Sequence, residues 1–134
     1  MRPLLPLLLL ACTTDPPVDT DPVDTDTPTP ALQPTWRGGV RDLLDVRCEP
    51  CHTSYAFGDL GIGTRGDLVD APSSIGMPYV TPGDLTSSYL WYKLLDTQDE
   101  VGGDGDRMPL DVAPFDADEM TLIETWIEDG APLE

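Results

Sequence analysis

The hydrophobic positions near the end of the chain predict a helix between Asp116 and Gly130. Apolar residues three or four positions apart lie on one face of a helix. Here that face comprises Met120, Ile123, Trp126 and Ile127. Asp116 precedes the segment and Glu119 stands three positions later, which is the spacing of an N-terminal capping box. Gly130 and Pro132 then end the helix, because glycine is common just after a helix and proline cannot continue it.

Two further helices are predicted upstream. The first covers residues 38–48, and its apolar face comprises Val40, Leu43 and Leu44. Gly38 and Gly39 at its start indicate either a close packing contact or a fraying first turn. The second covers residues 88–96, with Ser87 as the N-cap. It is apolar almost all round, so we expect it to be largely enclosed; the residues concerned are Tyr89, Leu90, Trp91, Tyr92, Leu94 and Leu95.

The segment between Thr53 and Thr86 shows no sustained period and is rich in Gly, Pro, Ser and Asp. It is therefore predicted to form loops with short turns. A loop of this length in a compact domain normally wraps around something.

The chain begins with a short apolar segment. In residues 1–11 Arg2 is the only charge, and a leucine-rich core follows it, as in an export signal. The segment ends at Cys12, and the sequence Leu9-Leu10-Ala11-Cys12 resembles a bacterial lipobox. We therefore expect removal of residues 1–11 and lipidation of Cys12. The alternative is an ordinary secretory leader with an incidental cysteine.

Residues 12–35 are rich in proline, threonine and aspartate and contain no lysine, arginine or aromatic residue. Such a segment cannot bury enough apolar surface to offset its conformational entropy. It is predicted to be a disordered, extended tether. The folded domain then covers residues 36–134.

Composition limits the function. The chain has 25 acidic against 7 basic residues and a formal net charge of −18 at pH 7. Nucleic acids and anionic lipids require a basic surface, so they are excluded as partners. No apolar run reaches eighteen residues, so no helix is predicted to span a bilayer.

The pentapeptide Cys48-Glu49-Pro50-Cys51-His52 is the attachment signature of c-type haem. Two thiols one helical turn apart can bond to two vinyl groups at one edge of a porphyrin, and the following histidine can reach the iron. Two alternatives are a Cys48–Cys51 disulfide, which is common in exported proteins, and a zinc site. The zinc site would need distant carboxylates, because this chain has one histidine.

The second axial ligand of such an iron would be a methionine or none. Met108 is the favoured candidate, because it follows a glycine-rich loop, residues 102–107, that could fold over the haem face. Met77 is a weaker candidate, and Met120 is expected in the core of the last helix. The side chains that could serve the haem propionates are Tyr89, Trp91, Tyr92, Lys93 and Arg107, with packing or solvent exposure as the alternative role of each.

These features together resemble the single-haem cytochrome c domains of exported bacterial lipoproteins. The matching residues are Met108-Pro109, Leu122, Ile123, Trp126-Ile127, Gly130-Ala131-Pro132 and the segment 80–95. The resemblance implies an all-α fold in which the first and last helices cross and the chain wraps one covalent haem c. It also implies that His52 and Met108 ligate the iron.

On this basis the expected function is one-electron transfer, without enzymatic activity, by a monomer tethered to a membrane through its lipid anchor. The expected partner is a redox protein with a basic docking patch, and the expected location is the periplasmic side of a bacterial membrane, in particular the outer membrane. Two alternatives are a haem-based sensor with a labile sixth ligand and a non-haem interaction domain with a Cys48–Cys51 disulfide.

Overall fold

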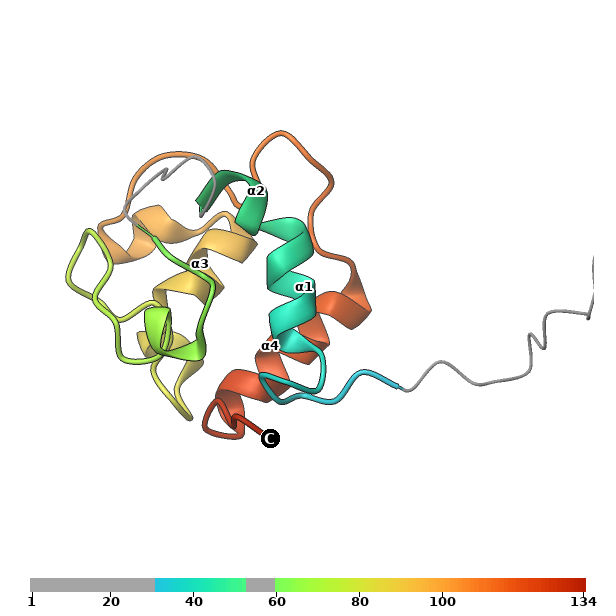
Figure 1. Cartoon of the computed structure of the whole chain (residues 1–134). Coiled ribbons are helices and arrows are strands. Elements are labelled where there is room, and N and C mark those ends of the chain that lie inside the picture. The colour runs from blue at the N-terminus through green and yellow to red at the C-terminus, as the bar shows by residue number, and fades with distance from the viewer. Residues whose placement is uncertain (1–30, 53–59) are drawn as a thin grey trace, which may run out of the picture. The chain divides into compact units, whose positions relative to one another are not determined.

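A computed structural model describes residues 31–52 and 60–134, and over these ranges the chain is helical with no β-strand (Figure 1). The α-helices are α1 (Val40–Arg47), α2 (Glu49–His52), α3 (Tyr89–Leu95) and α4 (Ala117–Glu128). Short 3-10 helices lie at Arg65–Asp67, Leu85–Ser87 and Gln98–Val101. The all-α class predicted from the sequence is therefore confirmed for the described residues. None of their helices combines the length and apolarity that a membrane crossing requires.

Helix α4 begins and ends where its sequence predicts. A side-chain oxygen of Asp116 accepts hydrogen bonds from the backbone N–H groups of Asp118 and Glu119, both at 2.9 Å. Glu119 completes the capping box by accepting from the Asp116 N–H at 2.9 Å. Gly130, with φ of 89°, follows the helix in the left-handed region that glycine adopts without strain. Of the face predicted to be apolar, Ile123, Trp126 and Ile127 are buried, whereas Met120 is half-buried. Leu122, which was not predicted for this face, is also buried.

Helix α1 packs against α4 to form the centre of the core. Val40 and Leu44 are buried on α1, and Trp36, just before the helix, packs against Trp126 with ring centroids 5.9 Å apart and ring planes tilted by 37°. The Trp36 N–H also donates to the Pro132 carbonyl at 2.9 Å, which joins the start of the domain to its end. At Gly38 a Cβ atom would overlap the Thr35 hydroxyl. The glycine therefore serves the close packing contact that was one of its two predicted roles.

The described domain includes residues that the sequence assigns to the tether. Gln33 donates its backbone N–H to the Gly38 carbonyl at 3.0 Å, and Leu32 lies against Gly39. These contacts place the beginning of the packed chain before Trp36. Residues 1–30, which contain the predicted signal, Cys12 and most of the tether, lie outside the described residues.

Helix α3 differs from its prediction in two respects. It begins at Tyr89 after Ser88, whereas Ser87 belongs to the preceding 3-10 helix and donates its hydroxyl to Asp84 at 2.7 Å. The helix is also not enclosed on all sides, because it packs by one face and leaves Leu95 46% exposed. The buried face comprises Tyr89, Leu90 and Leu94.

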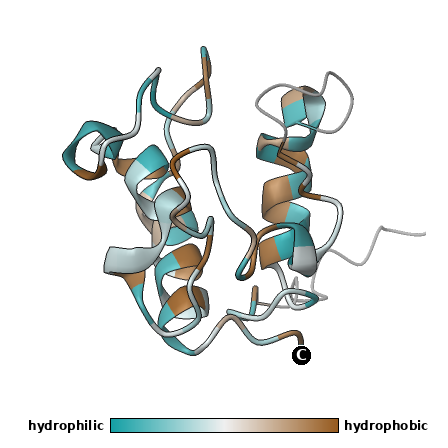
Figure 2. Ribbon diagram, turned by 90° about the vertical axis from the view of Figure 1, so that its left-hand side faces the viewer, coloured by the Kyte–Doolittle hydropathy of each residue, from teal (hydrophilic) through white to brown (hydrophobic). Residues whose placement is uncertain are grey.

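The segment from Leu60 to Ser88 is loop-rich, as predicted, with one 3-10 turn near its start and one at its end. It nevertheless supplies core residues: Ile62, Leu68 and Val80 are all at most 2% exposed. Hydrogen bonds in both directions between residues 68–70 and Val80 hold the segment together (Val80 N to Leu68 O, 3.0 Å; Asp70 N to Val80 O, 2.9 Å). Hydrophobic and hydrophilic positions alternate around the helical ribbons in Figure 2. The core is thus built from one face of each longer helix and from the loop beside them.

Candidate functional site

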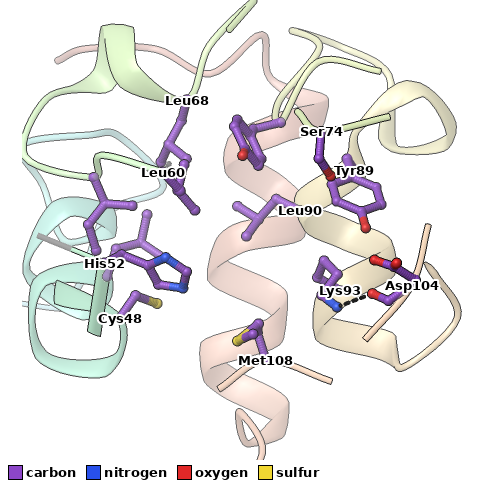
Figure 3. A pocket seen from close by; sticks show the side chains of 13 residues that line it. Cys48, His52, Leu60, Leu68, Ser74, Tyr89, Leu90, Lys93, Asp104 and Met108 are labelled. Atoms are coloured by element: carbon purple, nitrogen blue, oxygen red, sulfur yellow. Dashed lines mark hydrogen bonds between the residues drawn. The ribbon is translucent and has the colours of Figure 1, made fainter. Parts of the chain in front are cut away.

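An apolar pocket lies between the end of α1, helix α3 and two loop-rich segments, residues 60–74 and 102–108. Its cavity measures about 170 Å³. In Figure 3, Cys48 and His52 line one side of it, and Tyr89 and Lys93 line the opposite side. The Met108 side chain lies at a third position at its border. The apolar part of the wall comprises Leu44, Leu60, Ile62, Leu68 and Leu90, and Ser74, Tyr79 and Asp104 complete it.

Cys48 and His52 reach this pocket because the chain turns sharply at the end of α1. Cys48 is the C-cap of α1 and donates its N–H to the Leu44 carbonyl at 2.8 Å. The N–H groups of Cys51 and His52 both donate to the Cys48 carbonyl at 3.1 Å, which forms the short helix α2. Cys51 is exposed and is not among the residues that line the pocket. Both cysteines are free thiols.

Burial determines the protonation of the Cys48 thiol. It raises the pKa of Cys48 to about 12, although the positive charge of Arg47 acts in the opposite direction. Nearby Cys51 and Asp45 add to the increase. Cys48 is therefore a neutral thiol at physiological pH, and it is not a preformed thiolate ligand.

Met108 is the methionine that lines the pocket within the described residues. Its backbone N–H donates to the Lys93 carbonyl at 2.9 Å, so the end of the glycine-rich loop is attached to α3. Met120 instead packs against the hydrophobic core, in the position expected for it, and Met77 is half-buried away from the pocket lining. The structure thus brings together His52 and Met108, the two predicted axial ligands, at one cavity.

Two of the five side chains considered for haem propionates line the pocket, namely Tyr89 and Lys93. Burial lowers the pKa of Lys93, against the opposing effect of Asp104 and other nearby carboxylates. The remaining three do not line it: Tyr92 donates its hydroxyl to the Thr86 carbonyl at 3.1 Å, Arg107 donates to Val112, and Trp91 packs at the edge of the core.

Sequence reasoning did not identify the pocket wall contributed by residues 60–74. Leu60, Ile62 and Leu68 lie in a segment without helical or strand periodicity, so their spacing carries no signal that they share a surface. The contacts of the half-buried Arg47 side chain were also not identified from the sequence. Its guanidinium donates to the carbonyls of Ala113 and Pro114, both at 2.9 Å, next to the cysteine that begins the signature.

The donor atoms fit the group that the sequence signature implies. The Cys48 thiol, the His52 imidazole and the Met108 thioether border one apolar cavity, and the last two are donors of the kind that ligate haem iron. Covalent attachment of haem c also uses the second thiol, that of Cys51, which is exposed and lies outside the lining. The cavity is smaller than the range of about 300–1,000 Å³ usual for cofactor pockets. A porphyrin would therefore require the walls to move apart, and two of those walls are the loop-rich segments 60–74 and 102–108. Among the described residues no group of three or more His, Cys, Asp or Glu side chains is placed to hold a metal ion.

Comparison with models of protein families, with curated proteins and with solved structures finds no match to this chain.

Proposed function

We propose that residues 31–134 form a single-haem c-type cytochrome domain that carries one electron at a time between exported redox proteins. The observation that supports this most directly is the shared apolar pocket of Cys48, His52 and Met108. Cys48 and His52 belong to one short motif, whereas Met108 is distant in the chain and lines the same cavity. The cavity wall is apolar apart from a few polar groups, which suits a large planar hydrophobic cofactor.

Each donor has a distinct role in this proposal. The thiols of Cys48 and Cys51 form the covalent links to the porphyrin. The His52 imidazole and the Met108 thioether would ligate the iron, and the leucines of the wall would exclude water. When bound, haem supplies a one-electron Fe(III)/Fe(II) couple.

Transfer of electrons, and not bond-making, follows from the ligand set. With His52 and Met108 both in place, the protein leaves no axial position for a substrate. A thioether favours Fe(II) relative to a second imidazole, and an apolar surrounding raises the potential further. Release of Met108 from the iron would convert the same pocket into a ligand-binding sensor. The strength of the Met108–iron bond therefore decides between electron transfer and ligand sensing.

The charge of the chain indicates the kind of partner. With a formal net charge of −18, it would be steered toward a redox protein that has a basic docking patch. Exposed carboxylates at Glu49, Asp104 and Asp106 lie on or next to the segments that form the pocket. We propose that the protein acts as a monomer and docks through this side.

We further propose that lipid on Cys12 anchors the chain to the periplasmic side of a bacterial membrane, in particular the outer membrane, after removal of residues 1–11. Residues 13–30 then act as the tether. An anchored carrier has a high effective concentration near partners on the same membrane. Globomycin-type inhibition of lipoprotein processing would leave residues 1–11 on the chain, which mass spectrometry detects.

The electron-transfer proposal is tested by mixing the reduced, haem-loaded protein with an oxidised basic redox protein and following absorbance at increasing salt. We expect fast, reversible exchange whose rate falls steeply with ionic strength. An acidic redox protein of similar potential is the matched control, and its rate should rise or stay level with salt. Slow exchange with both partners at every ionic strength would contradict the proposal.

A further inference from the structure

The loop that carries Met108, residues 102–108, is held by three side chains of α3 and the 3-10 helix after it. We propose that Tyr89, Lys93 and Gln98 act as a clamp that positions Met108 and sets how long its thioether stays on the iron. This inference rests on the proposed function, because it concerns the lifetime of the proposed Met108 bond. The three are positioning residues, since they act through the loop.

Lys93 forms the centre of the clamp. Its Nζ donates to the carbonyl of Asp104 at 3.1 Å and to that of Asp106 at 2.5 Å (Figure 3 shows the Asp104 contact). Its own carbonyl accepts the Met108 N–H at 2.9 Å. One residue of α3 therefore holds the loop at two points before Met108 and at Met108 itself. Because the side-chain donor is charged, these bonds are stronger than bonds between neutral groups.

Tyr89 lies one helical turn before Lys93 and faces the same pocket. It is 5% exposed, and its hydroxyl lies so close to Gly103 that a Cβ atom there would overlap it. The glycine thus allows the loop to approach the tyrosine. The contact fixes the distance between the loop and α3 at the end opposite to Met108.

Gln98 holds the middle of the loop from the 3-10 helix that follows α3. Its side-chain Nε2 donates to the Gly105 carbonyl at 2.7 Å, and its own carbonyl accepts the Gly103 N–H at 2.8 Å. Gln98 is 5% exposed, so this polar side chain is buried on the loop. Buried hydrogen bonds of this kind are costly to lose, because the unpaired groups remain out of water.

The consequence concerns exchange of the axial ligand. A loop with several glycines is flexible by itself, and a thioether on such a loop would leave the iron readily. With the clamp in place, displacement of Met108 requires the loss of its hydrogen bonds to α3 as well as of the iron bond. The clamp therefore favours the electron carrier over the ligand-binding sensor.

The test measures the rate at which added imidazole replaces Met108 in the oxidised, haem-loaded protein. Lys93→Gln and Gly103→Ala each disrupt the clamp, one by removing a charged donor and the other by forcing the loop away from Tyr89. We expect Lys93→Gln to accelerate displacement at least about tenfold, because it loses the charged donor of two hydrogen bonds. Gly103→Ala should accelerate displacement as well, because the added methyl group overlaps Tyr89. Lys93→Arg, which keeps the charge and the donors, should restore much of the parent rate.

Matched controls separate the clamp from general destabilisation. Tyr92→Phe removes a hydroxyl on the same helix that bonds to Thr86, and Gly66→Ala adds a methyl group with no contact closer than 3.7 Å. Both should keep the parent rate of Met108 displacement.

Tyr89→Phe is a third clamp variant. It removes only the hydroxyl, should remain folded, and should also accelerate displacement of Met108.

Backbone hydrogen exchange gives a second readout, and residues 103–108 should lose protection in Lys93→Gln while residues 117–128 keep it. If all clamp variants exchange ligand and hydrogen at the parent rate, the clamp proposal is overturned. If the parent protein itself lacks haem or the spectral band of Met–iron ligation, the proposed function fails instead, and the two failures are thereby distinguished.

Discussion

The guanidinium of Arg47 lies over the ring of Phe115, with its central carbon 5.1 Å from the ring centroid. The same group donates to the carbonyls of Ala113 and Pro114 and lies 3.5 Å from a carboxylate oxygen of Glu119. Arg47 directly precedes Cys48, and its contacts therefore connect the end of α1 to the start of α4. The planar guanidinium supplies several donors in a fixed geometry, which a lysine cannot reproduce.

We predict that Arg47→Lys lowers the free energy of unfolding by about 1–2 kcal/mol, because the forked hydrogen bonds and the ring contact are lost while the charge is kept. Urea unfolding followed by tryptophan fluorescence measures the change. Arg41→Lys is the matched control, because Arg41 is 53% exposed and pairs with Asp45 on the same helix. An equal effect of the two substitutions would show that the Arg47 junction has no special role.

Trp36 and Trp126 pack against each other in the core. We predict that removing the Trp126 side chain lowers the free energy of unfolding by a large amount. Trp126 is fully buried, and its ring N–H donates to the Pro132 carbonyl at 3.1 Å. We expect Trp126→Ala to cost about 3–5 kcal/mol of stability, as is usual for removal of a buried aromatic side chain. Leu133→Ala, at a position 43% exposed, should change the unfolding midpoint little. A small effect of Trp126→Ala would contradict the described packing of α1 on α4.

Asp84 predicts a pH dependence of stability. Hydrogen bonds from the hydroxyls of Thr86 and Ser87 hold the pKa of Asp84 below its ordinary value of 3.8. A lowered pKa in the folded state means that the ionised carboxylate stabilises the fold above pH 3.8 and that this contribution is lost as the pH falls below that value.

Asp84→Ala should therefore be less stable than the parent at pH 7, and the difference should shrink as the pH falls below 3.8. Thermal unfolding at a series of pH values measures it. Asp99→Ala removes the same charge at another exposed position and is the control. A difference between Asp84→Ala and the parent that stays constant down to low pH would refute the role of the ionised carboxylate.

We predict that replacing Met108 changes both the reduction potential of the haem and the binding of added imidazole. In the haem-loaded protein, Met108→Ala should lower the reduction potential and allow imidazole to bind without competition, because the thioether that favours Fe(II) is gone. Redox titration and imidazole titration measure the two effects. Met77→Ala removes a methionine that does not line the pocket and should leave both unchanged. If Met77→Ala changed the reduction potential and imidazole binding and Met108→Ala did not, Met77 and not Met108 would be the ligand.

Local signals in the sequence predict the helices well where one segment contains all the information. The Asp116–Glu119 capping box and Gly130 lie within or next to α4, so its bounds follow from short-range chemistry. Helix α3 shows where this fails. Its apolar residues predict enclosure, but whether each side is covered depends on distant parts of the chain, and the side of Leu95 faces solvent.

The residues of the candidate site likewise include some that the sequence predicts and some that it does not. Cys48, Cys51 and His52 form a contiguous motif, and Met108 stands out because a glycine-rich loop precedes it. The wall formed by Leu60 and Leu68, like the hold of Lys93 on the Met108 loop, depends on contacts between segments without periodic patterns. Such contacts become visible only when the fold brings the segments together.

The absorption spectrum of the purified protein tests the central claim most directly. The chain is expressed in a host with haem-maturation machinery, and its spectrum is recorded oxidised and then reduced. We predict the sharp reduced bands of a c-type haem that stays attached after denaturation, and a weak far-red band of Met–iron ligation in the oxidised protein. A colourless protein that still unfolds cooperatively would contradict the account.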